Sequence, residues 1–300
     1  MSGFEFNLWD PGFQPDILNN KDSFGNIEWT YADIIENIYE ALRKEFPNYI
    51  NRKIIGRDSS GQYDIFAYEF CPPHYQKTIY IQSGVHCLET EGYFGLARLM
   101  YLICHDFDER LTEMKSKIRF LVVPCVSVYG VSKKGTIENI MSCERYAIPN
   151  SIYGINPNRD FYDLKCEETR AVRSYVAENS DKISVCFDFH TTTMPDWNAY
   201  LLIWPDGMKD NLTVSHENIN NMLYEKNKPE FKKAFMGPES KYPTGAIKGS
   251  FTGGFFDEFN INSYTVEHSD YVFDKKLGTS KAMTKAVELY GNHVLFEAGC

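Results

Sequence analysis

Apolar residues recur at helical spacing in several stretches of the chain. The first stretch follows Thr30, a residue suited to a helix N-cap, and stops at Pro47. Its apolar positions lie three and four residues apart and would share one helix face: Ile34, Ile35, Ile38, Tyr39, Leu42 and Phe46. The same kind of pattern predicts four further helices, over Glu91–Cys104, Glu168–Val176, Asn211–Tyr224 and Ser280–Phe296.

Short apolar runs rich in β-branched and aromatic residues lie between these helices. They predict strands around Ile54-Ile55 and over Tyr63–Phe70, Thr78–Val85, Ile118–Val126, Ile183–Phe189, Ala199–Trp204 and Ser263–Val266. Strands that alternate with helices favour an α/β fold, with a central mixed, mostly parallel sheet covered by helices on both faces. No repeat or low-complexity linker divides the chain. Residues 29–300 are therefore expected to form one domain, preceded by an irregular N-terminal arm over residues 1–28.

Composition narrows the classes of function. The 300 residues are 43% hydrophobic, which is enough for a large core, and the net charge of −10 disfavours binding to nucleic acid. No apolar stretch reaches the length of a membrane span, and the first residues lack the pattern of a signal peptide, so we expect no membrane association and a cytoplasmic location. The eight cysteines form no C-x-x-C pair, so a thiolate zinc site is not expected.

Candidate metal ligands stand at the ends of three predicted strands, where α/β sheets gather their sites. His86 follows the first of these strands, with Glu89 three residues later; His190 ends the second, and Glu267 ends the third. Alone, each has an ordinary explanation as a hydrogen-bonded or surface residue. Together, two histidines and one carboxylate leave one zinc position open for water, and a second carboxylate, Glu267, can act as general base.

Several ordered motifs around these residues resemble the zinc carboxypeptidase family, the carboxypeptidase A-like M14 metallopeptidases. They run from Thr30-Tyr31 with Phe46-Pro47 through Ile55-Gly56-Arg57, His86-x-x-Glu89, Asn158-Arg159-Asp160-Phe161, Phe187-Asp188-Phe189-His190-Thr191 with Tyr200–Pro205, and Thr265-Val266-Glu267. The resemblance covers roughly Trp29 to the C-terminus. It implies a carboxypeptidase-like fold, one Zn²⁺ per chain held by His86, Glu89 and His190, and Glu267 as the catalytic base.

The resemblance also assigns roles around the substrate, which would be a peptide or N-acyl amino acid with a free carboxylate. Arg159 and Asn158 would hold that carboxylate, and Arg145 would stabilise the oxyanion. Tyr242 would cover the substrate, and Thr252 would lie near its terminal side chain, where a neutral residue favours a neutral or acidic terminus. The oligomeric state is not readable from the sequence.

Some features depart from the family or leave alternatives open. Asn156 stands where many relatives have an aspartate that orients the first zinc histidine, so metal affinity is expected to change. Rival readings are a deacylase of small N-acyl amino acids, similar to succinylglutamate desuccinylase and aspartoacylase, a cell-wall peptide carboxypeptidase, and an inactive binding module. The sequence gives His74, His105, His216 and His293 no partner at ligand spacing, and it predicts a loop over Gly245–Gly254.

Overall fold

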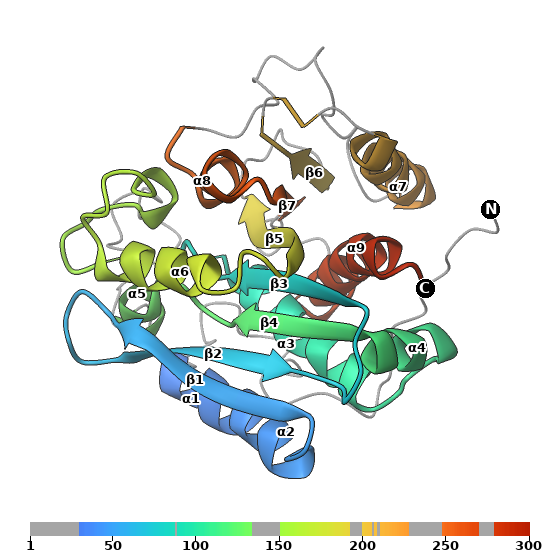
Figure 1. The fold of residues 1–300 in the computed structure, drawn as a ribbon, viewed down its shortest axis with the longest axis horizontal. Helices are drawn as coiled ribbons and strands as arrows, with labels where there is room; N and C mark the ends of the chain where they lie inside the picture. Colours follow the sequence, from blue (N-terminus) through green and yellow to red (C-terminus); the bar gives the residue numbers. More distant parts are fainter. Residues whose placement is uncertain are drawn as a thin grey trace.

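A seven-stranded sheet forms the centre of the molecule in the computed structural model, which describes residues 30–87, 89–133, 151–192, 200–205, 207–208, 211–227, 248–269 and 279–300 (Figure 1). Its order is β1-β2-β4-β3-β5-β7-β6. The central strands β4, β3, β5 and β7 are parallel, and β1, β2 and β6 add antiparallel edges. The strands are β1 (Ile50–Arg57), β2 (Asp64–Phe70), β3 (Lys77–Ser83), β4 (Ile118–Val123), β5 (Ile183–Thr192), β6 (Tyr200–Ile203) and β7 (Asn262–Ser269).

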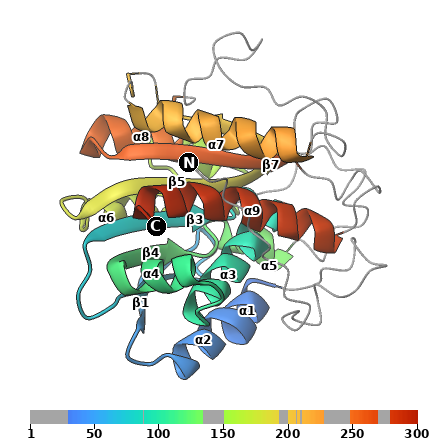
Figure 2. The same cartoon turned by 90° about the vertical axis from the view of Figure 1, so that its right-hand side faces the viewer.

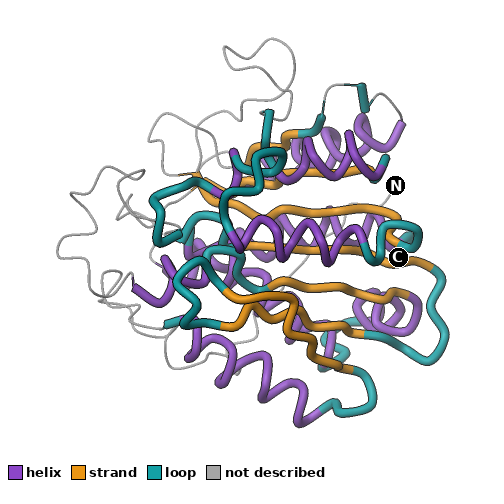
Figure 3. Tube along the Cα trace, turned by 60° about the vertical axis from the view of Figure 1, so that its left-hand side comes forward, coloured by secondary structure: helices purple, strands orange, loops and turns teal. Residues whose placement is uncertain are grey.

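Helices cover both faces of this sheet, as predicted. Figure 2 looks onto the face that carries α1 with α2, then α3, α4, α9 and α7, whereas α6 and α8 lie on the other face. In Figure 3 the strands, drawn in orange, run between these two groups of helices. The helices are α1 (Tyr31–Ile34), α2 (Glu40–Glu45), α3 (Thr90–Cys104), α4 (Glu109–Lys117), α5 (Val128–Lys133), α6 (Glu167–Ala177), α7 (Asn211–Asn227), α8 (Phe251–Phe259) and α9 (Thr279–Ala298).

The first helical segment begins as the sequence predicts. The Thr30 hydroxyl accepts from the Asp33 backbone N–H and the Asp33 carboxylate accepts from the Thr30 N–H, which completes a capping box. The segment continues through a π-helical stretch (Ile35–Tyr39) into α2, and its apolar face is buried. The helix α2 ends shortly before Pro47. A proline has no backbone N–H and cannot continue the helical hydrogen bonds.

Aromatic side chains fill the space between the sheet and its helices. Tyr80 of β3 packs edge-on against Phe255 of α8, with ring centroids 5.7 Å apart. On the opposite face Phe189 of β5 stacks on Tyr290 of α9 at 4.0 Å. All four rings are fully buried. The stacking of Phe189 on Tyr290 packs the C-terminal helix against the strand that carries His190.

Three local predictions need correction. Residues 251–254 belong to α8 and not to a loop; Ser250 caps this helix by accepting from the Gly253 N–H, and the two glycines hid its helical character. The strands β5 and β7 are longer than predicted, so His190 and Glu267 lie inside them. The short polar helix α4, capped by Asp108, was not predicted.

No helix among the described residues is long and apolar enough to cross a membrane. The N-terminal arm predicted over residues 1–28 lies outside the described part of the chain.

Candidate metal centre

A tight turn after β3 positions the first two candidate ligands. The strand ends at Ser83, and Gly84 adopts a positive φ of 61°, a conformation that side chains disfavour. The chain then turns through His86, whose carbonyl accepts from the Glu89 N–H at 3.2 Å. Glu89 stands immediately before α3, so its carboxylate extends from the start of that helix.

Close packing of α3 on β5 brings Glu89 to the third candidate ligand. A Cβ atom at Gly92 would lie 2.9 Å from the carbonyl oxygen of Phe189, so only glycine allows this approach. The backbone N–H of Thr191 donates to Glu89 Oε2 at 3.1 Å, which fixes the carboxylate beside His190. The first turn of α3 and the end of β5 therefore form one rigid unit.

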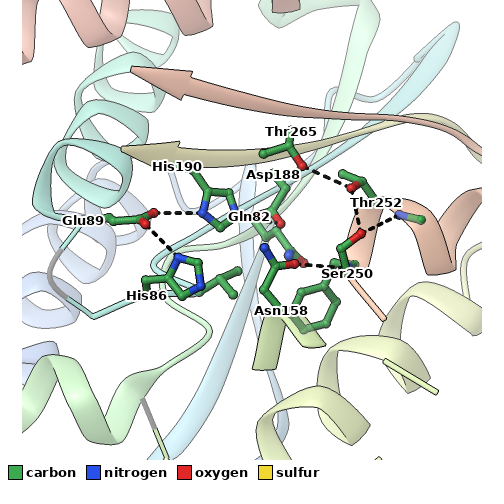
Figure 4. Close-up of polar contacts among 12 residues, drawn as sticks. Gln82, His86, Glu89, Asn158, Asp188, His190, Ser250, Thr252 and Thr265 are labelled. Atoms are coloured by element: carbon green, nitrogen blue, oxygen red, sulfur yellow. Dashed lines mark hydrogen bonds and ion pairs between the residues drawn. The ribbon is translucent and has the colours of Figure 1, made fainter. Parts of the chain in front are cut away.

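The side chains of His86, Glu89 and His190 converge on one point (Figure 4). His86 Nδ1 lies 2.7 Å from Glu89 Oε1, and His190 Nδ1 lies 2.8 Å from Glu89 Oε2. One ligand atom from each residue falls within 4.8 Å of the other two. Two imidazole nitrogens and a carboxylate that leave a position open are the donor set of catalytic zinc.

Each histidine is oriented through its other ring nitrogen. His86 Nε2 lies 3.2 Å from Asn156 Oδ1, and His190 Nε2 lies 2.9 Å from Asp188 Oδ2. With Nε2 directed at these oxygen atoms, the Nδ1 atom of each ring points toward Glu89, where a metal would lie. The Tyr290 hydroxyl also donates to the His190 carbonyl at 2.7 Å.

Asp188 and Tyr290 were not predicted as parts of the site. Asp188 stands two residues before His190 on the same strand, and that spacing places both on one face. The D-x-H spacing was thus a usable signal for Asp188. Tyr290 lies on α9, 100 residues from His190 in the sequence. No pattern in the neighbouring sequence indicates that its hydroxyl contacts His190.

The electrostatics of the centre favour a cation. Burial alone would raise the pKa of Glu89, but the nearby His86 and His190 outweigh it and hold that pKa well below its ordinary value. Burial alone would lower the pKa of His190, but Asp188 and Glu89 outweigh it and raise that pKa well above its ordinary value. The same carboxylates that stabilise a proton on His190 would stabilise a metal ion.

Glu267 lies on β7, directly beside His190 in the register of the parallel strands β5 and β7. Residues paired in this way project to the same face of a sheet, and Glu267 is half-buried. The next residue, His268, therefore projects to the opposite face and is buried. Glu267 therefore lies beside His190, on the same face of the sheet.

A short turn holds the two predicted carboxylate-binding residues. Asn156 Oδ1 accepts from the Asn158 N–H at 2.9 Å and caps the 3₁₀ turn Pro157–Arg159. Asn158 is buried, and its Oδ1 accepts from the Phe251 N–H at 3.2 Å, which joins the turn to α8. Arg159 is exposed, and its guanidinium donates to the Asn158 carbonyl.

Comparisons with known proteins identify the family of the chain. The family model for zinc carboxypeptidase (Peptidase M14) matches residues 35–283. The chain belongs to the zinc carboxypeptidase family. It is therefore a metallopeptidase in the carboxypeptidase class of hydrolases.

Solved structures show the same fold at low sequence identity. A metallo-carboxypeptidase from Burkholderia cenocepacia is 16% identical with a TM-score of 0.65, and the alignment covers 91% of this chain and 70% of that one. Carboxypeptidase A from Helicoverpa armigera is 15% identical with a TM-score of 0.64, over 91% and 75% of the two chains. A metallo-carboxypeptidase from Pseudomonas aeruginosa is 14% identical with a TM-score of 0.64, over 90% and 70%. The search of curated proteins found no match.

The residues of this zinc carboxypeptidase fit the metal that the family implies. The three donor atoms lie close together, an oxygen atom lies beside the Nε2 atom of each histidine, and the carboxylates of Glu89 and Asp188 flank the centre. Among the substrate residues, Thr252 is buried on α8, and its hydroxyl lies 3.1 Å from that of Thr265 on β7. The predicted residues Arg145 and Tyr242 lie outside the described residues.

Proposed function

We propose that this zinc carboxypeptidase removes single residues from the C-termini of peptides, using one Zn²⁺ held by His86, Glu89 and His190. The observation that carries the proposal is the convergence of these three donors with Glu267 beside them in the β5–β7 register. An inactive binding module would not need this combination of metal ligands and base. The family match adds support, because it spans the same residues.

The reaction needs a base, an acid and an activated water. Bound zinc supplies a Lewis acid that polarises the scissile carbonyl and lowers the pKa of water. Glu267 takes a proton from the attacking water, whose oxygen bonds to the carbonyl carbon. Glu267 then returns that proton to the amine as the carbon–nitrogen bond breaks. One carboxylate thus serves both proton transfers, and the products are a shortened peptide and a free amino acid.

Recognition of the terminal carboxylate restricts cleavage to the last residue. In the proposal Arg159 binds the carboxylate through its planar fork, and Asn158 donates a hydrogen bond beside it. The exposed guanidinium of Arg159 and the anchored turn that carries it support this role. The Pseudomonas aeruginosa relative was solved in complex with (2-guanidinoethylmercapto)succinic acid, which is a dicarboxylic acid.

Three further residues complete the proposed site. Arg145 stabilises the negative charge on the carbonyl oxygen, and Tyr242 closes over the substrate. Thr252 lies near the terminal side chain of the substrate, and its contact with Thr265 offers neutral hydroxyl groups there. Residues with neutral or acidic side chains are therefore the expected termini, and faster release of C-terminal Lys or Arg would contradict this.

A deacylase of small N-acyl amino acids is the second candidate. The segment Asp188-Phe189-His190-Thr191 is compatible with it, and Asp188 does contact His190. The match to the zinc carboxypeptidase model and the carboxypeptidase neighbours favour the peptidase.

The test combines metal analysis with a peptide library. We expect about one zinc per purified chain, release of single C-terminal residues, and loss of both in His190→Ala. The matched variant Glu267→Gln is expected to keep zinc but lose hydrolysis, because it removes only the base. Zinc without peptide cleavage, but with release of N-acyl groups, would favour the deacylase. A wild-type chain that binds no zinc after reconstitution would refute the proposal.

A further inference from the structure

A second pair of histidines lies buried between α7 and α9, away from the metal centre. His216 Nδ1 and His293 Nδ1 are 2.8 Å apart, and neither side chain is exposed to solvent. The rings are surrounded by aromatic groups: His216 packs against Phe187, Tyr264 and Phe296. No local pattern in the sequence indicates the pair, because its members are 77 residues apart.

The partners of the outer nitrogens decide where the hydrogens are. His216 Nε2 lies 2.9 Å from the carboxylate oxygen Oε1 of Glu297, and His293 Nε2 lies 2.7 Å from Asn220 Oδ1. Both partners are oxygen atoms, so a hydrogen bond at each contact requires that Nε2 be the donor. If both rings were neutral, each would then present an Nδ1 lone pair to the other at 2.8 Å, which is repulsive.

A proton between the two Nδ1 atoms removes this conflict, and the geometry fits a proton better than a metal. A separation of 2.8 Å is a normal N–H···N hydrogen bond. Two nitrogens bound to one tetrahedral zinc at its usual bond length would lie about 3.3 Å apart. Among the described residues, the pair is also absent from the clusters of three or more ligands able to hold a metal.

The charges around the pair show which ring holds the extra proton. Burial, followed by the neighbouring His216, holds the pKa of His293 well below its ordinary value, so His293 is neutral and accepts through Nδ1. His216 is then the ring placed to donate from both nitrogens, because its Nε2 faces the carboxylate of Glu297. Lys77 of β3 approaches the same carboxylate at 3.4 Å and donates to the Glu297 carbonyl, and the phenol of Tyr264 on β7 faces the His216 ring.

We propose that His216 and His293 hold one shared proton between their Nδ1 atoms at neutral pH, and that this proton fastens α7 to α9. The folded cluster binds one proton, balanced by Glu297. In the unfolded chain both histidines titrate near pH 6.5 and hold two protons in acid and none in alkali. The cluster therefore stabilises the fold most around neutral pH, and its contribution falls on both sides.

Glutamine at position 297 separates this proposal from a purely structural contact. In Glu297→Gln the amide N–H₂ can donate to His216 Nε2, so every hydrogen bond is satisfied with a neutral His216. The fold is retained while the need for the extra proton disappears. The control is Glu45→Gln, which makes the same change at the exposed contact between Glu45 and His105.

The first measurement is the long-range ¹H–¹⁵N spectrum of histidine-labelled, zinc-loaded protein at pH 7.5. Both nitrogens of His216 are expected at the shifts of protonated nitrogen, and one nitrogen of His293 at the shift of an unprotonated one. In Glu297→Gln one His216 nitrogen is expected to become unprotonated, and this change also assigns the signals if His216 variants do not fold. A wild-type His216 with an unprotonated nitrogen at this pH overturns the proposal.

The second measurement is chemical unfolding against pH. Between about pH 7.5 and 9 the unfolding constant of the wild type should rise relative to that of Glu297→Gln by up to roughly tenfold per pH unit, the slope for one proton. Glu45→Gln should follow the wild type. Parallel profiles of the wild type and Glu297→Gln would show that no proton is held.

Discussion

The two histidine pairs of this protein share one arrangement and differ in what lies between them. In each pair the ring centroids are 5.0 Å apart, and the Nε2 atoms face one amide oxygen and one carboxylate oxygen. Between His86 and His190 stands the carboxylate of Glu89, whereas His216 and His293 contact each other directly. Two oriented histidines do not by themselves make a metal site; a third, anionic ligand decides whether a metal or a proton fits.

Access to solvent reinforces this difference. The side chain of His86 is 24% exposed, but those of His216 and His293 are fully buried. A metal and a substrate can reach the first pair, while only a proton needs to reach the second. The contrast can be broken or sharpened by three sets of substitutions.

Removal of Glu89, the anionic ligand between the two histidines, should have the largest effect. Glu89→Ala leaves two histidines with no anion between them, so we expect zinc to be lost from the purified protein. Hydrolysis of peptides should fall by on the order of a thousandfold or more, since the Lewis acid is gone. Elemental analysis and peptide release measure both. Glu45→Gln, at an exposed contact outside the metal centre, serves as the control and should keep its zinc. Stoichiometric zinc in Glu89→Ala would contradict the comparison.

Substitution of Asp188 or Asn156, the residues that face the Nε2 atoms of His190 and His86, should have a smaller effect. Asp188→Asn removes the charge beside His190 Nε2, and we expect zinc to bind about 10–100-fold more weakly. Asn156→Asp adds a charge beside His86 Nε2 and should strengthen binding. Competition with a chelating dye gives both affinities. Equal affinities in the wild type and both variants would show that these partners do not tune the metal.

The smallest effect is expected at Glu168, a buried carboxylate without a histidine beside it. Its pKa is shifted in the direction opposite to that of Glu89. Glu168 accepts from the N–H and hydroxyl of Ser59, and burial raises its pKa, whereas Glu89 beside two histidines has a lowered one. A raised carboxyl pKa means that stability falls as pH rises from the unfolded value, near 4.3, through the folded value.

Glu168→Gln should therefore match or exceed the wild type in stability at pH 7, because the amide oxygen keeps both hydrogen bonds without a charge. Glu168→Ala should lose on the order of 1 kcal/mol, because it leaves the Ser59 N–H without its acceptor. Urea unfolding at pH 5 and pH 7 measures the difference. A Gln variant that is less stable than the wild type only at pH 7 would reverse the expected sign.

The parts of the molecule that the sequence predicted are those with local patterns. The α/β sheet follows from alternating strand and helix periods, and His86 with Glu89 follows from a three-residue spacing beside a strand. The contacts of His190 with Asp188 could also have been read from one strand. The pairing of His216 with His293 could not, because it depends on the packing of two helices. The helix α8 was missed because Gly253 and Gly254 weaken the helical signal, although Ser250 provides a cap.

One oxygen atom joins the metal centre to the 3₁₀ turn Pro157–Arg159. Asn156 Oδ1 faces His86 Nε2 and also accepts from the Asn158 N–H. A ligand that moves Asn158 must therefore alter the orientation of His86. Thermodynamic linkage then requires that the metal change the affinity for such a ligand by the same factor as the ligand changes the affinity for the metal. Metal and terminal carboxylate would in this way bind as cooperative partners, with a single amide as the coupling element.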